Sequence, residues 1–452
     1  MHRRNTNIRW AAASSWVVAL GLRLWFVLSV IRDNSATAIE QFCKDSEGYL
    51  HLAQNLATDG VYAQADHLSR HLAALRPPGY PAFCALFEWM GWSPDGVLVA
   101  QAVIGSFIAP LAVWLAWGFL RNATGAVCVG LLVALSPTGI GLTGIVMADL
   151  LQALGLAGGL LLLDRGVVRR RGLWICAAGL VFGLSVLVKP IMMFWPPASV
   201  AVWWFTARDA GRRMRWGIVP AFLLLQILPM GAWAVRNYQV EGVPAVTIIS
   251  AQSLRCYVMP VVSLWAENGA RPTNDMILHE RTPDWDEELE ALRQNQTLPA
   301  DVQQRQMQES LPVLRAHPWL TAAVWLGSIR ENLFSRWQYF PVQLPSMGFL
   351  QRVLVGSLSV TRYTQLLWYL CLPVLVVGWM RRRRLLLSIH SGLALLIVVG
   401  FFVSLSGGTY WAGSRILYPV EFVLHILMVA GLLQIFQYVK GLIAGQPDNQ
   451  QR

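Results

Sequence analysis

The chain has 452 residues, of which 55% are hydrophobic and only 13% are charged, whereas a soluble domain carries about 25% charged residues. This balance excludes an ordinary soluble protein and predicts a polytopic integral membrane protein of the all-α class. The net charge of +11 does not indicate nucleic-acid binding, because the arginines stand in short clusters between apolar segments, as they do in cytoplasmic loops. We expect membrane lipids, and no nucleic acid, as partners.

The first apolar run predicts a transmembrane helix. It follows a basic stretch at residues 1–10 and extends to about Ile31. A basic start and the small residues at 36–38 also fit a secretory signal peptide. However, a run of about twenty residues is long enough to cross about 30 Å of hydrocarbon and is longer than a usual signal core. Arg23 within it is expected to face other helices or to extend toward the membrane surface.

Further apolar segments bring the predicted number of spans to about ten. They lie at about 97–119, 126–140, 147–163, 173–188, 190–206, 216–235, 364–380, 385–405 and 415–437. With this number of spans the arginine clusters fall on one side of the membrane, as the positive-inside rule requires, and both termini are cytoplasmic. The expected location is the inner, or plasma, membrane.

The order of apolar and polar segments predicts three parts. Residues 1–235 form an N-terminal transmembrane module with an extracytoplasmic loop at 32–96, residues 236–362 form an extracytoplasmic, partly helical cap, and residues 363–452 form C-terminal transmembrane helices. Within the cap, Thr282 and Pro283 precede an acidic run and predict a helix start. Partial disorder around 267–308 is the alternative, because that stretch is poor in hydrophobic residues.

The loop between residues 45 and 81 is polar although long apolar segments flank it, so it belongs at the membrane–water boundary. Apolar residues recur in it at helical spacing, at Tyr49, Leu52, Ala53, Leu56 and Ala57. This spacing predicts an amphipathic helix along the membrane surface with Asp45 at its amino end. Asp45 is there either as an N-cap, which stabilises a helix by about 1 kcal/mol, or as a functional carboxylate.

A second carboxylate, Asp149, begins the apolar segment that follows the turn at 141–146. With Gln152 three residues on, it has the spacing of a capping box. An acidic group at the membrane boundary on the same side as Asp45 also permits a site with paired carboxylates. Both interpretations stay open from the sequence.

Single cations on the non-cytoplasmic side are candidates for anion binding. Arg76 opens the sequence Arg-Pro-Pro-Gly-Tyr-Pro, whose prolines bar a helix and hold the guanidinium in a defined place, which suits phosphate recognition. Lys189 and Arg415 stand near the ends of two other apolar segments. The alternatives are pairing of Arg76 with lipid headgroups and anchoring of helix ends by the other two.

The cysteines and histidines do not indicate a metal site. The six cysteines lack metal-ligand spacing, and His67 with His71, four positions apart, lacks a third ligand. No metal and no cofactor is expected. A disulfide between Cys43 and Cys84 would fit if the first loop faces an oxidising compartment.

The motif D-x-x-x-Y-x-x-x-A-x-x-L from Asp45 to Leu56, followed by R-x-P-G-Y-P from Arg76 to Pro81, resembles the GT-C superfamily of polytopic glycosyltransferases. The similar families are the protein O-mannosyltransferases, the aminoarabinose transferases of lipid A and other polyprenyl-phosphate-sugar transferases. Further matches are Leu-Val-Lys-Pro ending at residue 190, the stretch 233–250 and the stretch 414–424.

The resemblance implies an inverting transfer of a sugar from a polyprenyl-phosphate donor, on the periplasmic face, to a lipid, glycan or protein of the cell envelope. It implies Asp45 as general base and Asp149 as a second catalytic acid that orients the acceptor or sugar. It assigns the donor phosphate to Arg76, Arg415 and, less directly, Lys189. Other residues would contact substrate: Glu47, Tyr49 and Tyr80. Many relatives carry their second acid directly after the first, so Glu47 is an alternative base.

Two rival functions remain. A transporter or lipid flippase would place charged or Gly/Pro-broken positions midway through its spans and would show symmetric halves. A non-catalytic subunit for envelope assembly would not need Asp45 or Arg76. Replacement of Asp45 by asparagine separates the enzyme from both rivals.

Overall fold

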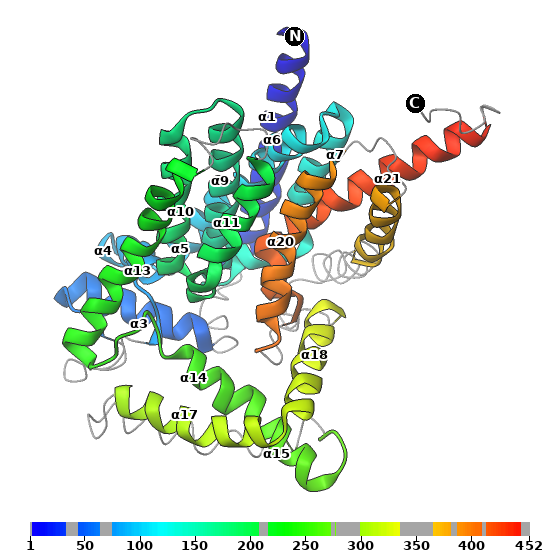
Figure 1. The fold of residues 1–452 in the computed structure, drawn as a ribbon. Helices are drawn as coiled ribbons and strands as arrows, with labels where there is room; N and C mark the ends of the chain where they lie inside the picture. Colours follow the sequence, from blue (N-terminus) through cyan, green and yellow to red (C-terminus); the bar gives the residue numbers. More distant parts are fainter. Residues whose placement is uncertain are drawn as a thin grey trace.

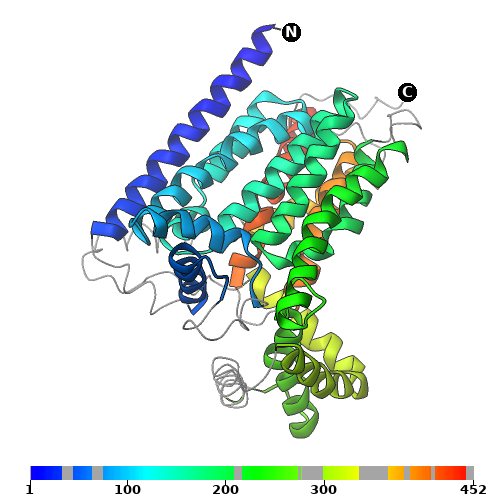
Figure 2. The same cartoon turned by 90° about the vertical axis from the view of Figure 1, so that its left-hand side faces the viewer.

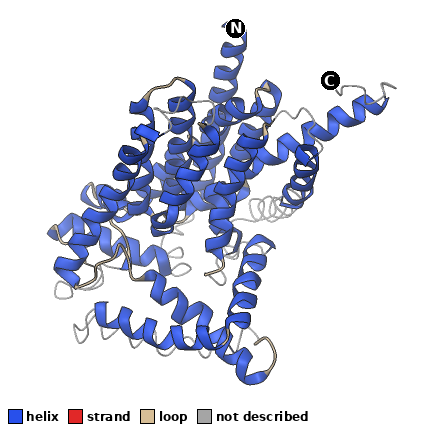
Figure 3. Cartoon of the chain, viewed as in Figure 1, coloured by secondary structure: helices blue, strands red, loops and turns tan. Residues whose placement is uncertain are grey.

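The computed structural model describes residues 2–32, 44–63, 75–207, 216–272, 276, 299–334, 365–380, 387–408 and 413–443. Every regular element within these ranges is helical (Figure 3), so the predicted all-α class is confirmed. The first half contains these elements: α1 (His2–Arg32), α3 (Lys44–Asp59), α4 (Gly79–Trp89), α5 (Asp95–Ser106), α6 (Ile108–Leu120), α7 (Ala123–Ala134), α8 (Pro137–Gly141), η2 (Leu142–Gly144), α9 (Asp149–Val168), α10 (Gly172–Val188), η3 (Pro190–Phe194) and α11 (Trp195–Thr206).

The second half continues with helices of the membrane bundle and of the predicted cap. They are α13 (Val219–Glu241), α14 (Ile249–Ser253), the π-helical turn η4 (Leu254–Val258), α15 (Met259–Asn268), α17 (Pro299–Ala316), α18 (Pro318–Phe334), α20 (Ile389–Ser406), η5 (Gly413–Val420) and α21 (Glu421–Ile443). An apolar helix at Gln365–Met380 precedes α20.

Six segments of the described chain are long and apolar enough to cross a membrane. They are Asn7–Arg32, Asp95–Leu120, Asp149–Val168, Val219–Glu241, Ile389–Ser406 and Arg415–Lys440. The bent pair of α7 and α8 brings the number to seven if it forms one span, and α10 and Gln365–Met380 are shorter apolar helices. The chain is thus of the multi-pass type, while the count of about ten spans stays a prediction.

The predicted span at 126–140 is broken, with a bend of 41° between α7 and α8. Pro137 stands at the start of α8 and cannot donate the backbone hydrogen bond that would continue α7. Ser136 caps the new helix, because its Oγ accepts a hydrogen bond of 3.0 Å from the amide of Gly139. The hydropathy of this stretch is continuous, but its backbone hydrogen bonding is not.

Arg23 faces other helices, as one of the two sequence expectations had it. It is fully buried, and its guanidinium donates to the carbonyl oxygens of Ala134 at 3.3 Å and Val133 at 3.5 Å. These carbonyls end α7 next to the break, and that of Val133 also accepts a hydrogen bond of 3.4 Å from the amide of Ser136. Arg23 therefore satisfies backbone groups inside the bundle.

The bundle packs closely where small residues meet backbone. α10 lies between α9 and α13. A Cβ atom on Gly179 would lie 2.5 Å from the carbonyl oxygen of Phe222, and one on Gly183 would lie 2.7 Å from that of Gln226. Larger residues would force α10 and α13 apart, which fits the role of small residues between membrane helices.

The two ends of the bundle differ in what they carry. In Figure 1, α1 begins and α21 ends toward the top, while α3 and α4 lie at the lower end of the bundle. Beyond that lower end lie α14, α15, α17 and α18, and the view in Figure 2 shows the same arrangement from the side. The first polar loop and the predicted cap thus share one end of the molecule.

The helices beyond the bundle have an apolar cluster of their own. Val258, Val261, Val262 and Val324 are buried together there. α13 continues to Glu241, past the predicted boundary at residue 235. The domain boundaries stay predictions, and the helix start predicted at Thr282 and Pro283 lies outside the described residues.

Candidate functional site

The first component of the site is the amino end of α3. Tyr49, Leu52 and Ala53 are buried at the spacing that defines one face of a helix, so the predicted amphipathic helix is confirmed. Asp45 lies in its first turn. The neighbouring Ser46 donates a hydrogen bond of 3.0 Å to the carbonyl oxygen of Val146, which fixes the start of α3 against the turn before α9.

Asp45 is in contact with two arginines from distant parts of the chain. Its Oδ1 accepts a hydrogen bond of 2.8 Å from Nη2 of Arg76, and its Oδ2 lies 3.5 Å from Nη2 of Arg415. The arginine side chains are 12% and 13% exposed, and that of Asp45 is 42% exposed. One carboxylate thus neutralises two nearly buried guanidinium groups at a place that solvent reaches.

The turn around Arg76 is rigid for reasons that the sequence contains. Pro77 and Pro78 fix the backbone after Arg76, and α4 begins at Gly79. A Cβ on Gly79 would lie 2.7 Å from the carbonyl carbon of Leu187, so this glycine permits the turn to pack on the carboxyl end of α10. The guanidinium of Arg76 also lies over the ring of Tyr49, 4.3 Å from its centroid.

Arg415 reaches the site from η5, which packs against α9 and α18. Its Nη1 donates to Sδ of Met147 at 3.0 Å. Because Met147 precedes α9 by two residues, η5 and the start of α9 are joined at this point. The last apolar segment thus contributes a cation beside the first polar loop.

Asp149 forms a second ion pair on the same side of the bundle. Its Oδ1 lies 2.6 Å from Nζ of Lys189, and its side chain is 1% exposed while that of Lys189 is 20% exposed. The capping-box interpretation is wrong: the N-cap of α9 is Ala148 without a side-chain cap, and Asp149 is the first residue of the helix. The carboxylate binds a lysine from the end of α10, and Gln152 is buried with no hydrogen-bond partner within the described part of the chain.

Tyr49 and Tyr80 are buried side by side. Their rings meet edge to face at a centroid distance of 4.7 Å. Tyr80 is fully buried, and its hydroxyl donates to Oε1 of Gln101, whose Nε2 donates to the carbonyl oxygen of Ile145 at 2.9 Å. Tyr80 therefore packs against Tyr49 and, through Gln101, links α4 to the turn before α9.

The charges around Asp45 keep its carboxyl group ionised, whereas burial keeps the Tyr49 hydroxyl neutral. Burial opposes ionisation of Asp45, but the positive charges of Arg76 and Arg415 and the hydrogen bond from Arg76 outweigh it, so the pKa of Asp45 lies well below its ordinary value. Lys189 acts in the same direction, which indicates that the two ion pairs are near each other. Burial raises the pKa of Tyr49 to about 12 despite the charge of Arg76.

Other sequence candidates lie elsewhere. Glu47 is exposed, whereas Asp45 contacts the arginines. Cys84, one half of the possible disulfide, is a buried free cysteine with Tyr80 as its neighbour in the core. Cys43, His67 and His71 lie outside the described residues. Among the described residues, no three His, Cys, Asp or Glu side chains are grouped as metal ligands.

Sequence reasoning missed the residues that hold the site side chains in position. Met147 and Gln101 carry no motif, and their roles depend on contacts between segments far apart in the chain. Arg236 lies inside the matched stretch 233–250 without an assigned role, and Tyr62 lies between the two motifs of the first loop. A tyrosine shortly before the Arg-Pro-Pro turn and a lone arginine near the end of an apolar segment were the available signals.

A cavity of about 400 Å³ lies among the described residues away from these groups. Its lining includes Arg121, Asp164 and His390. Asp164 lies fifteen residues after Asp149 on α9, a separation of about 22 Å along a helix. This cavity is therefore at the opposite end of the bundle from Asp45.

No protein-family model and no curated protein matches the chain. Among solved structures, the apo oligosaccharyltransferase of Archaeoglobus fulgidus is similar, with 14% sequence identity, a TM-score of 0.51 and coverage of 98% of this chain and 52% of that chain. The chain thus spans about half the length of that enzyme.

Two structures of ArnT from Cupriavidus metallidurans also match, each with a TM-score of 0.35. The one bound to undecaprenyl phosphate has 14% identity and covers 95% of this chain and 81% of that chain, and the apo one has 15%, 89% and 74%. At such identities a likeness concerns the fold alone. The described part of this chain is all-helical, and its fold is similar to that of part of an oligosaccharyltransferase.

Proposed function

We propose that the protein is an integral membrane glycosyltransferase of the GT-C type, which moves a sugar from a polyprenyl-phosphate donor to a lipid, glycan or protein of the cell envelope. The reaction takes place at the periplasmic face of the inner membrane and inverts the anomeric carbon. The observation that carries this proposal is the Asp45 carboxylate in contact with both Arg76 and Arg415.

The two guanidinium groups suit the donor phosphate. Guanidinium forms charge-assisted hydrogen bonds with phosphate as readily as with carboxylate, so a phosphate can compete with Asp45 for Arg76 and Arg415. Negative charge on the leaving phosphate grows as its bond to the sugar breaks, and fixed positive charge stabilises that change. Lys189, held by Asp149, adds a third cation nearby.

Asp45 serves as the general base. The acceptor hydroxyl or amine attacks the anomeric carbon from the side opposite the phosphate, a new glycosidic bond forms, and the bond to the phosphate oxygen breaks with its electron pair. The proton of the acceptor passes to Asp45. Once a phosphate neutralises Arg76 and Arg415, the pKa of Asp45 rises toward its ordinary value, and the carboxylate becomes a better base.

Asp149 and the tyrosine ring complete the proposed arrangement. Oδ2 of Asp149 is buried and has no hydrogen-bond partner among the described residues, so it can accept a hydroxyl hydrogen from sugar or acceptor. The buried Tyr49 ring lies against the Arg76 guanidinium and helps to hold it in place. Exposed Glu47 remains the alternative base.

The rival transporter function draws on Arg23, a charged residue buried within a candidate span. Its hydrogen bonds to backbone carbonyls at the α7–α8 break give it a structural role instead. The proposed chemistry also accounts for the cations at one end of the bundle, which a structural subunit does not need.

The test is sugar transfer by Asp45→Asn in membranes from a strain that lacks the native gene. The donor is found first, as the lipid-linked sugar that accumulates in that strain. Transfer is expected to fall by a factor of about 10²–10⁴, the usual contribution of a general base, while Glu47→Gln stays near wild type. Unchanged transfer by Asp45→Asn together with a loss in Glu47→Gln would move the base to Glu47, and unchanged transfer in both would remove the mechanism.

A further inference from the structure

Arg236 lies close to the carboxyl end of α13 and has partners on two segments. Its Nη1 donates to the carboxylate of Glu241 and, at 3.2 Å, to Oδ1 of Asn237. Its Nη2 donates to the carbonyl oxygen of Tyr62 at 3.2 Å. One guanidinium therefore joins the end of α13 to the segment that follows α3.

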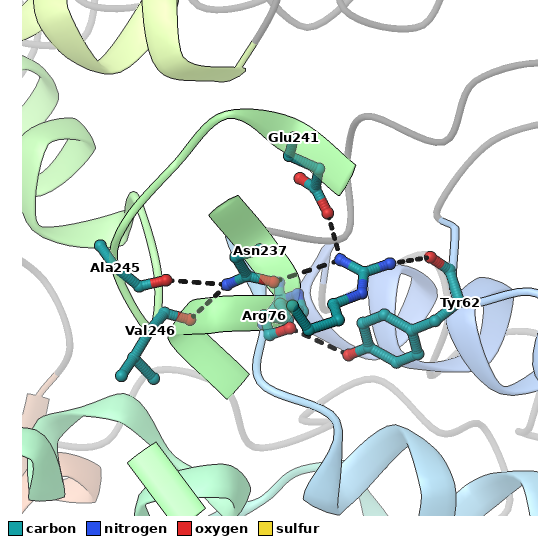
Figure 4. Close-up of polar contacts among 7 residues, drawn as sticks. Tyr62, Arg76, Asn237, Glu241, Ala245 and Val246 are labelled. Carbon is teal, nitrogen blue, oxygen red and sulfur yellow. Dashed lines mark hydrogen bonds and ion pairs between the residues drawn. The ribbon is translucent and has the colours of Figure 1, made fainter. Parts of the chain in front are cut away.

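Tyr62, whose carbonyl accepts a hydrogen bond from Arg236, is itself hydrogen-bonded to Arg76. Figure 4 shows its ring pointing toward the Arg76 backbone, where the Tyr62 hydroxyl donates to the carbonyl oxygen of Arg76 at 2.9 Å. The ring meets Trp233 edge to face at 5.2 Å, and the guanidinium of Arg236 lies 5.7 Å from the Tyr62 ring centroid and 5.0 Å from that of Trp233. Tyr62 is thus held at its backbone, its ring and its hydroxyl.

The preceding carbonyl is held from the same helix by another route. Oγ1 of Thr247 donates to the carbonyl oxygen of Leu75 at 2.7 Å. The segment that carries Thr247 is fixed in turn by Asn237, whose Nδ2 donates to the carbonyl oxygens of Ala245 and Val246 (Figure 4) at 2.9 and 3.2 Å. Consecutive carbonyls before the Pro-Pro turn are therefore both secured from the end of α13.

These contacts are built into the protein interior. The side chain of Glu241 is 0% exposed and that of Arg236 is 26% exposed, and Asn237 is fully buried. Removing one member of a buried ion pair destabilises the fold because an unpaired charge is left buried. The Arg236–Glu241 pair therefore holds the backbone at the end of α13 in place. Asp45 pairs with Arg76 and Arg415, so Arg236 acts on the site through intermediates, and Tyr62 is the one that donates a hydrogen bond directly to the Arg76 backbone.

We propose that Arg236 is a positioning residue that, through Tyr62, sets the backbone of Arg76 so that its guanidinium can bind the donor phosphate. This inference rests on the proposed function, because it assigns to Arg236 the affinity of that same phosphate site. It predicts that Arg236 and Arg76 act on phosphate binding as one unit.

The test measures binding of a polyprenyl monophosphate to the full-length protein in nanodiscs, with the corresponding polyprenol as the reference without charge. Arg236→Gln is expected to weaken phosphate binding about tenfold, and Tyr62→Phe to weaken it by a smaller factor. In an Arg76→Gln background both effects should vanish, since residues in one network are not additive. Arg315→Gln, which replaces an exposed arginine on α17, is the matched control and should bind as wild type.

A second variant separates positioning from loss of folding. Arg236→Gln with Glu241→Gln removes both charges of the buried pair, so no carboxylate loses its arginine. This double variant is expected to unfold near the wild-type temperature and still bind the phosphate about tenfold more weakly, because glutamine is too short to reach Tyr62 as arginine does.

The outcomes distinguish the two proposals. If the wild type binds the monophosphate no better than the polyprenol, the donor site itself is wrong and the role of Arg236 falls with it. If the wild type prefers the monophosphate and Arg76→Gln removes that preference, while Arg236→Gln binds as wild type or weakens binding equally in the Arg76→Gln background, only the inference about Arg236 is overturned.

Discussion

Asp45 and Arg76 form a hydrogen-bonded ion pair of 2.8 Å although 31 positions of the chain separate them. The guanidinium of Arg76 is the less exposed partner, and its backbone is secured from α13. The carboxylate is therefore the more accessible member, and it occupies donor groups that a phosphate would need. In the proposed mechanism, Asp45 and the donor phosphate therefore compete for the same arginines, which gives measurable consequences.

Asp45→Asn should affect donor binding and sugar transfer in opposite directions. The neutral amide competes less well for Arg76 and Arg415, so a polyprenyl monophosphate should bind up to about tenfold more tightly, as expected for one charge-assisted hydrogen bond. Transfer should nevertheless be lost for want of a base. Binding in nanodiscs and single-turnover transfer measure the two effects, and weaker binding by Asp45→Asn would contradict the competition.

The pH dependence should differ between free enzyme and donor complex. In the free protein the two arginines lower the pKa of Asp45 against the effect of burial, so the carboxylate stays charged until the solution is strongly acidic. A bound phosphate neutralises the arginines and raises that pKa. The acid limb of kcat, which reports the complex, should therefore lie at higher pH than that of kcat/KM.

The lowered pKa of Asp45 also sets the direction in which pH changes stability, and Asp45→Asn is the control for the pH profiles. A carboxylate with a lowered pKa in the folded state stabilises the fold above its unfolded value of about 4, and this contribution is lost as the pH falls toward the folded pKa. Asp45→Asn should lack the acid limb that belongs to Asp45 in residual transfer. Coincident acid limbs of kcat and kcat/KM in the wild type would show that the phosphate does not displace the carboxylate.

The Asp149–Lys189 pair should matter for stability as well as for the site. Lys189→Met leaves a carboxylate that is 1% exposed without its lysine, which should cost about 3 kcal/mol. Asp149→Asn combined with Lys189→Met should recover most of that loss, because no buried charge remains. Thermal unfolding in detergent checks both, with exposed Arg330→Gln on α18 as the control; a double variant as unstable as Lys189→Met would contradict this account.

Sequence periodicity predicted the helices that bury one continuous face, and α3 is the clearest case because Tyr49, Leu52 and Ala53 follow helical spacing. Local backbone chemistry also predicted the fixed turn at Arg76, since proline acts on its own neighbours. Span boundaries were harder to place: the apolar run at 126–140 hides a break that Ser136 and Pro137 produce.

Partners from distant segments were beyond local reasoning. Asp149 and Gln152 have capping-box spacing, yet Lys189, 40 positions away, binds the carboxylate. Arg415 meets Met147 across 268 positions, and no spacing rule connects them. The sequence could place these cations on one side of the membrane through the positive-inside rule, but which acid each would bind depends on how η5, α9 and α10 pack.

Arg23 offers a test of the fold that is independent of the chemistry. It is fully buried and donates to the carbonyls of Val133 and Ala134, which lie at the end of α7 next to the break at Ser136 and Pro137. Arg23→Met keeps an unbranched apolar stem but removes the guanidinium that donates to these carbonyls, at a cost of about 1–3 kcal/mol for a buried group left unsatisfied.

The unfolding temperature of Arg23→Met should therefore drop clearly, whereas Arg9→Met, at an exposed position of α1, should unfold like wild type. Folded Arg23→Met should bind a polyprenyl monophosphate with unchanged affinity, because Arg23 interacts with backbone carbonyls of α1 and α7 and with Tyr418, whereas Asp45 pairs with Arg76 and Arg415. A transporter that used Arg23 to carry its substrate would show the reverse pattern, with intact stability and lost transport. Unfolding and binding measured on the same preparations decide between a residue that satisfies a broken helix and one that handles a substrate.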